Sequence, residues 1–71
     1  MSRPADPEPL AAKIWTVAKV MDASATTVRR RVRDDPDFPK PFRLVPGGEP
    51  RWWLPDVRAY LARKAGRPLA A

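Results

Sequence analysis

The segment from Ser24 to Arg33 places the strongest constraint on what this chain can fold into. Its residues Ala25, Val28 and Val32 recur at positions i, i+3 and i+7, which predicts a helix with one buried stripe. Ser24 stands directly before this pattern, where its hydroxyl can cap the helix. Four arginines share the segment, so the exposed surface of this helix is expected to be strongly basic.

A second helical pattern precedes this segment. Val17, Val20 and Met21 fall at i, i+3 and i+4, and Thr16 is expected to cap their helix. Only Asp22-Ala23 separates the two patterns, so the helices are joined by a tight turn. Two short helices of which the second is basic are typical of a helix-turn-helix, whose second helix lies along DNA.

Proline and glycine divide the rest of the chain. Pro36 is expected to end the second helix, because it disfavours helical backbone at the residue before it. Every second residue between Phe38 and Phe42 is a proline, which predicts an extended connector whose two phenylalanines enter the core. The β-prone runs 42–45 and 51–53 then flank a Gly-Gly turn, which predicts a hairpin. One of its faces is expected to carry Phe42, Leu44 and Trp52, and the other Arg43, Arg51 and Trp53.

A third helix closes the pattern. Pro55 and Asp56 suit its first turn, and Gly66 is expected to end it. The expected stripe of this helix consists of Val57, Tyr60, Leu61 and Lys64. The predicted fold class is mainly α with a small β-hairpin, a winged helix-turn-helix in the order helix, helix, hairpin wing, helix. It occupies residues 13–65, between a disordered leader at 1–12 and a flexible basic tail at 66–71.

Composition narrows the classes of function. The 71 residues include no cysteine and no histidine, which excludes disulfides, the usual zinc sites and Cys/His catalysis. So small a chain has little room for a catalytic cleft, and we expect a binding protein with no catalytic residue, no metal and no cofactor. No apolar run approaches the roughly 20 residues that span a membrane, and the N-terminus lacks the core of a signal peptide. We therefore expect a cytoplasmic protein that does not bind membranes.

The net charge of +6 favours a polyanionic partner. This charge is unevenly placed. Residues 1–23 are balanced, and the positive excess lies from Arg29 onward. The positive field is therefore expected over the second helix and the C-terminal third.

Several short motifs resemble the AlpA and excisionase group of small DNA-binding proteins of phages, prophages and integrative plasmids. In chain order they are Thr16-Val17-Ala18-Lys19-Val20, Ala23-Ser24, Thr26-Thr27-Val28, Asp37-Phe38-Pro39-Lys40-Pro41, Arg51-Trp52 and Val57-Arg58-Ala59-Tyr60-Leu61. They span about residues 14–64, and the Phe-Pro-Lys-Pro connector is the most specific. The resemblance implies a MerR-like winged helix-turn-helix. One departure is Asp22, where the family commonly has glycine between the two helices.

The candidate DNA contacts follow from these two helices and the hairpin. Ser24 and the start of the second helix are expected to meet phosphate, because a helix N-terminus attracts anions. The expected base-reading residues are Thr26, Thr27, Arg29 and Arg30, with Arg31 and Arg33 further along on phosphate. The hairpin is expected to place Gly47, Gly48, Arg43 and Arg51 at the minor groove or its phosphates.

Some of these residues have structural alternatives. The arginine run could be a solvated face paired with the acids at 34–37, and Arg51 could brace that acidic loop. Trp15, Trp52 and Tyr60 are expected in the core, whereas Trp53 faces the other way as a partner contact or a lid. The adjacent carboxylates Asp34 and Asp35 are expected to keep the loop soluble and not to form a metal site or an acid/base pair.

Three functions remain open at the level of sequence. The first is an excisionase, or recombination directionality factor, which binds and bends attachment-site DNA, acting with an integrase and with other copies of itself. The second is an AlpA-like transcriptional regulator of a prophage or mobile element. The third is a protein-interaction module that uses Trp53 and the basic helix on an acidic partner. A salt titration separates the first two from the third, because DNA binding weakens steeply with salt.

Overall fold

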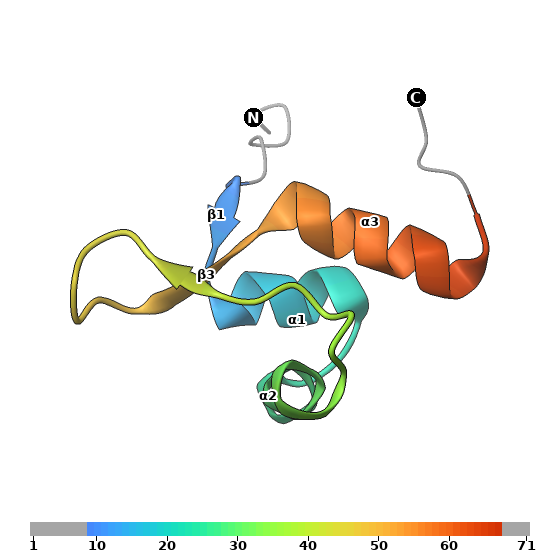
Figure 1. Cartoon of the computed structure of the whole chain (residues 1–71), viewed down its shortest axis with the longest axis horizontal. Coiled ribbons are helices and arrows are strands. Elements are labelled where there is room, and N and C mark those ends of the chain that lie inside the picture. The colour runs from blue at the N-terminus through green and yellow to red at the C-terminus, as the bar shows by residue number, and fades with distance from the viewer. Residues whose placement is uncertain (1–8, 68–71) are drawn as a thin grey trace, which may run out of the picture.

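The computed structural model describes residues 9–67 and shows three helices with a small antiparallel sheet (Figure 1). The elements are β1 (Ala11–Ala12), α1 (Ile14–Met21), α2 (Ala25–Asp34), β2 (Phe42–Arg43), β3 (Pro50–Trp53) and α3 (Leu54–Ala65). The predicted order of helix, helix, hairpin and helix is confirmed, with one additional strand before α1.

Helix α1 begins earlier than the sequence indicated. It starts at Ile14, and the backbone N–H of Thr16 donates to the Lys13 carbonyl at 3.1 Å, so the prediction of Thr16 as the cap is wrong. The helix directs Val17 and Ala18 into the core. Trp15 lies on the opposite side and is 66% exposed, so its assignment to the core is also wrong.

The turn between α1 and α2 depends on Asp22. Its backbone lies in the left-handed region, at φ 55° and ψ 47°, and its N–H donates to the Lys19 carbonyl. This conformation favours glycine, although aspartate tolerates it better than most residues. The turn therefore forms with aspartate at a backbone position that favours glycine.

Helix α2 follows the predicted pattern. Ser24 caps it, with Oγ accepting a hydrogen bond from the Thr27 N–H at 3.1 Å. Val28 is fully buried, and Ala25 and Val32 are half-buried beside it. The helix ends at Asp34, just before Asp35-Pro36, as expected.

The sheet has the order β1-β3-β2, and both pairings are antiparallel. In β1, Ala12 lies opposite Trp52 and is fully buried. The Leu10 carbonyl also accepts a hydrogen bond from the Leu54 N–H at 2.8 Å. The predicted leader at 1–12 was therefore too long, because its last residues belong to the folded domain; residues 1–8 lie outside the described part.

Strands β2 and β3 form the predicted hairpin, and Phe42 pairs with Arg51. Its tip contains a β-turn in which the Gly48 N–H donates to the Val45 carbonyl at 2.9 Å. Gly47 has φ 74°, the third-residue conformation of a type II turn following Pro46. A Cβ on Gly48 would lie 2.8 Å from a Val45 methyl group, so both glycines are needed.

Helix α3 ends at Ala65, followed by Gly66 in the left-handed conformation at φ 66°, which confirms the predicted stop. Its inward residues Leu54, Val57 and Tyr60 are buried, whereas Lys64, expected in the same stripe, is exposed. Pro68 and the rest of the predicted tail beyond Arg67 lie outside the described residues.

The core forms where α1, α2, α3 and β3 meet. Its buried residues are Ala12, Val17, Ala18, Val28, Phe38, Trp52, Leu54, Val57 and Tyr60. Phe38 packs edge-on against Tyr60, with ring centroids 4.9 Å apart. Phe42 is 37% exposed, so only the first connector phenylalanine enters the core. Phe42 pairs with Arg51 and so lies on the sheet face opposite Trp52, because neighbouring strand residues alternate between the faces. The prediction that Phe42 and Trp52 share a face is therefore wrong.

Over residues 9–67, none of the helices is both long and apolar enough to cross a bilayer.

Candidate nucleic-acid interface

The candidate interface is built on α2, which lies at one margin of the molecule and is seen along its axis in Figure 1. Val28 anchors this helix to the core, so the opposite side of the helix faces outward. Thr26, Arg29, Arg30 and Arg33 are all exposed, as the pattern indicated. Thr27 is half-buried at the edge of this surface, and Arg31 is exposed.

The N-terminus of α2 has a local positive potential. The Ser24 cap satisfies one backbone N–H, and the Thr27 hydroxyl lies 3.1 Å from the Ser24 hydroxyl. The first turn carries no acidic residue, so the positive end of the helix dipole is not neutralised by a nearby carboxylate on the same turn. Such a helix start attracts phosphate or another anion.

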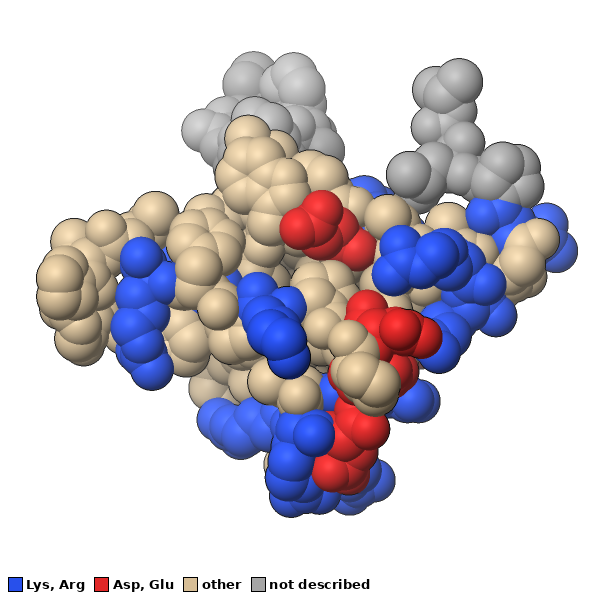
Figure 2. Space-filling model, viewed as in Figure 1, with Lys and Arg blue, Asp and Glu red and all other residues tan. Residues whose placement is uncertain are grey.

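The side chains of Arg29, Arg30 and Arg31 form no hydrogen bond or ion pair with any residue between 9 and 67. Figure 2 shows lysine and arginine side chains across the lower part of this view, over α2, and at the left, over the hairpin. Three adjacent guanidinium groups therefore have no hydrogen-bond or ion-pair partner in the described chain, although Arg30 and Arg31 interact at longer range with Asp34 and Asp35.

Arg33 differs from these three. Its guanidinium donates two hydrogen bonds to the Asp34 carboxylate, at 2.8 and 3.1 Å. These bonds raise the pKa of Arg33 and lower the pKa of Asp34. The Asp34 carboxylate therefore competes with any external phosphate for Arg33, which weakens the expected role of Arg33 as a phosphate contact.

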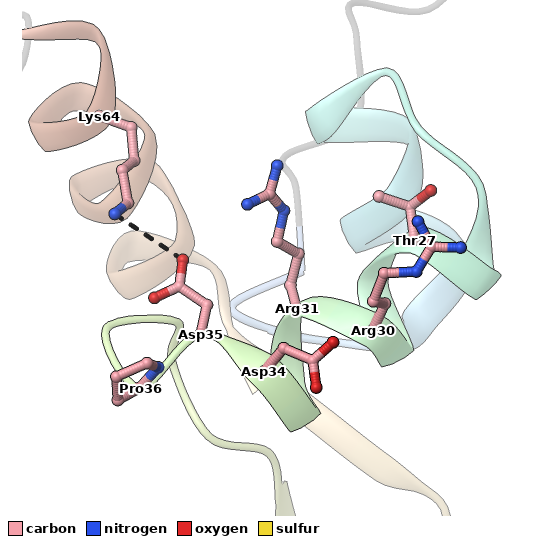
Figure 3. A pocket seen from close by; sticks show the side chains of 7 residues that line it. All are labelled: Thr27, Arg30, Arg31, Asp34, Asp35, Pro36 and Lys64. Atoms are coloured by element: carbon pink, nitrogen blue, oxygen red, sulfur yellow. Dashed lines mark ion pairs between the residues drawn. The ribbon is translucent and has the colours of Figure 1, made fainter.

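The other acids after α2 bind to α3. The Tyr60 hydroxyl donates to Asp35 at 2.7 Å, and Lys64 lies 3.8 Å from Asp37. Lys64 also lies 3.8 Å from Asp35, the ion pair that Figure 3 marks with a dashed line. The hydrogen bond from Tyr60 and that from the Asp37 backbone N–H hold the pKa of Asp35 below its usual value. Burial, together with the bond to Asp35, raises the pKa of Tyr60. These contacts fix the end of α2 against α3.

A groove of about 530 Å³ separates α2 from Lys64 on α3. Figure 3 shows Arg30 and Arg31 extending from α2, with Asp34 and Asp35 at the end of the helix. Because cations and carboxylates share this groove, its charges largely offset one another. This flank of α2 is less suited to a polyanion than the outward face.

The hairpin supplies the second group of predicted residues. The Arg43 guanidinium donates to the Gly48 carbonyl, which ties the arginine to the Gly47-Gly48 turn. Leu44 and Val45 leave the tip apolar and exposed. Arg43 and both glycines therefore lie together at the protruding end of the hairpin.

Arg51 does not join that group. Its guanidinium donates to the Ala11 carbonyl at 3.0 Å and is half-buried, so it holds β1 against the sheet. The alternative that it braces the acidic loop is wrong, because its hydrogen bond goes to β1 and not to residues 34–37. Trp53 is 42% exposed and faces away from the core, as expected.

Two ionic contacts were not anticipated from the sequence. The first is the connection of Tyr60 and Lys64 to the acidic loop. The second joins Lys13 to Glu49 at 3.5 Å, between the start of α1 and the hairpin. Neither pair has a sequence spacing that brings its members together within one helix or strand, so no local signal was available. Across the described ranges, no cluster of three or more potential metal ligands occurs, and the acidic loop forms no such site.

Comparison of the chain with protein-family models, with curated proteins and with solved structures finds no match.

Proposed function

We propose that this protein binds duplex DNA sequence-specifically as a winged helix-turn-helix, with α2 in the major groove and the β2–β3 hairpin as the wing. The observation that carries the proposal is the set of unpaired guanidinium groups at Arg29, Arg30 and Arg31 on the exposed side of a helix anchored by Val28. An arginine in the major groove can donate two hydrogen bonds to guanine. A helix of this diameter fits that groove.

The positions of the acidic residues support the interpretation that the basic face of α2 binds DNA, over the alternative that it only contacts solvent. If the arginine run served solubility alone, the neighbouring carboxylates would be expected to pair with it. Instead Asp34 bonds Arg33, and Asp35 and Asp37 contact Lys64. None of the three preceding arginines forms an ion pair with these acids, and Arg30 and Arg31 interact with Asp34 and Asp35 only at longer range.

The hairpin supports a second contact with the same duplex. Its tip protrudes to one side of α2 in Figure 1, and Arg43 is held at the turn. A narrow minor groove concentrates negative potential and attracts arginine.

For the biological role we propose an excisionase, a recombination directionality factor that bends attachment-site DNA and assists an integrase. This role rests on the resemblance of the motifs. Bending a site by 40–90° costs about 1–6 kcal/mol, which several bound copies can supply together. The protein itself performs no chemistry in this role.

Two experiments test sequence-specific binding and the role in excision. The first selects duplexes from a randomised pool, and the second is footprinting on the DNA that flanks the gene. Enrichment of one motif supports sequence-specific binding. Protected repeats beside a recombination site support excision. Protection over a promoter alone contradicts excision and favours a transcriptional regulator, and failure to enrich any duplex contradicts DNA binding.

A further inference from the structure

A second groove, of about 440 Å³, lies on the other flank of α2, between that helix and the hairpin. Its lining is mainly apolar, with charged groups from α2 and the hairpin. The lining residues are Ile14, Arg29, Val32, Pro41, Arg43, Glu49, Pro50 and Trp52.

The geometry of the proposed complex determines which part of the DNA would lie in this groove. If α2 occupies a major groove and the hairpin reaches the adjacent minor groove, one sugar–phosphate strand must run between them. We infer that this strand lies in the α2–hairpin groove, with Arg29 and Arg43 on its phosphates. Deoxyribose is largely apolar and matches the apolar lining, and phosphate matches the two guanidinium groups. The inference rests on the proposed function.

The charges of this groove favour a sugar–phosphate strand. The groove between α2 and α3 favours it less, because carboxylates there offset the cations. Glu49 is the one acid in the lining, and Lys13 lies 3.5 Å from its carboxylate. Arg29 has no hydrogen-bond or ion-pair partner within the described chain. Arg43 donates one bond to Gly48, and a guanidinium has five N–H donors. The flank therefore presents free donors over an apolar surface.

The helical geometry of α2 gives its arginines different roles. Successive residues are turned by about 100°, so Arg29 and Arg31 lie about 200° apart around the axis. Arg29 lines the hairpin groove, whereas Arg30 and Arg31 line the groove toward α3. Arg30 is turned about 180° from the midpoint of the buried Val28–Val32 stripe and points most directly outward. Arg29 is thus a positioning residue on the backbone, and Arg30 is the base reader, a division that the sequence-based assignment of both to bases did not make.

The test uses the selected duplex with one phosphate at a time replaced by a neutral methylphosphonate. For the wild-type protein, a replacement in the strand between the two occupied grooves is expected to lower affinity roughly tenfold, the equivalent of one charge-assisted hydrogen bond. Arg29→Ala should cause a similar loss on selected and random duplexes and leave base preference unchanged. The same methylphosphonate should then have little further effect on Arg29→Ala, because both changes remove one contact.

The matched control is Arg63→Ala, which removes the same charge from α3 outside both grooves. It should remain sensitive to the methylphosphonate. A second pair compares Glu49→Gln with Asp56→Asn, an equal charge change on α3, and only Glu49→Gln is expected to strengthen binding several-fold.

The outcomes separate the inference from the function on which it rests. A wild-type protein that binds no duplex overturns both. A protein that binds DNA overturns the inference alone if Arg29→Ala shifts base preference. The same holds if no phosphate between the grooves matters, or if Arg29→Ala and the methylphosphonate act additively.

Discussion

Replacement of Ser24 separates the stability of α2 from its interaction with DNA. The Ser24 hydroxyl accepts a hydrogen bond from the Thr27 N–H at 3.1 Å, and no acid in the first turn can substitute for it. Ser24→Ala is therefore expected to lower the free energy of unfolding by about 1 kcal/mol, the usual cost of a lost N-cap. For a domain of this size that loss lowers Tm by about 4–8 °C. Urea and thermal unfolding followed by circular dichroism measure both quantities.

Ser24→Asp is the informative counterpart. A carboxylate at this position still accepts the Thr27 N–H, and its charge favours the positive end of the helix by about 0.3–1 kcal/mol. The variant should unfold at or above the wild-type midpoint. It should nevertheless bind duplex DNA roughly tenfold or more weakly, because it places a negative charge where phosphate approaches. An unchanged midpoint for Ser24→Ala would refute the cap, and wild-type DNA affinity for Ser24→Asp would refute the phosphate-facing helix start.

Three further predictions concern the site and its support. Arg30→Ala should weaken binding to the selected duplex by about 1–3 kcal/mol and relax preference at one base pair, measured by competition; equal losses on random DNA would contradict base reading. Val28→Ala deletes two buried methyl groups and should cost about 2 kcal/mol in urea unfolding, whereas a cost near zero would show that α2 is not anchored there. The hydrogen bond from Tyr60 lowers the pKa of Asp35 in the folded protein. The contribution of this bond to the free energy of unfolding should therefore be complete above pH about 4, the pKa of Asp35 in the unfolded chain, and be lost as the pH falls through the lower pKa of the folded protein. Tyr60→Phe should flatten this acid dependence, and an unaltered pH profile would contradict it.

The parts of the fold that the sequence predicted are governed by local chemistry. Ser24 caps α2, Gly66 ends α3 and Gly47 adopts a positive φ in the hairpin turn. Each effect depends on a residue and its near neighbours, so periodicity and turn chemistry were sufficient. The exposed positions of α2 follow from the same periodicity once Val28 is assigned to the core.

The errors arose where distant segments decide the outcome. Ala11 and Ala12 have little intrinsic strand preference and form β1 only because β3, about forty residues later, offers its edge. That pairing leads directly into α1, which starts before Thr16 and leaves Trp15 on the outer side. Arg51 is held by the same added strand, since its partner is the Ala11 carbonyl.

The candidate site was predicted as a list of residues and not as an arrangement. Sequence spacing indicated that Arg29 and Arg30 are both exposed, but the two flanks of α2 become distinct only when the hairpin and α3 are in place. The hydrogen bond from Tyr60 to Asp35 also joins residues that are 25 positions apart in the sequence, so it forms only when α3 packs against the end of α2. Asp35 binds Tyr60 and Lys64 and forms no ion pair with the arginines of α2.

The most direct test of DNA binding is the salt dependence of affinity for a short random-sequence duplex, measured by fluorescence anisotropy. Each neutralised phosphate contributes about 0.9 to the slope of log affinity against log salt, so phosphate contacts from Arg29, Arg43 and the α2 N-terminus predict a slope of about −3. Replacing Arg29 and Arg43, the two proposed phosphate contacts, by glutamine should reduce the magnitude of the slope by about 2. A slope near zero, or no binding to any duplex at low salt, would contradict DNA recognition by α2.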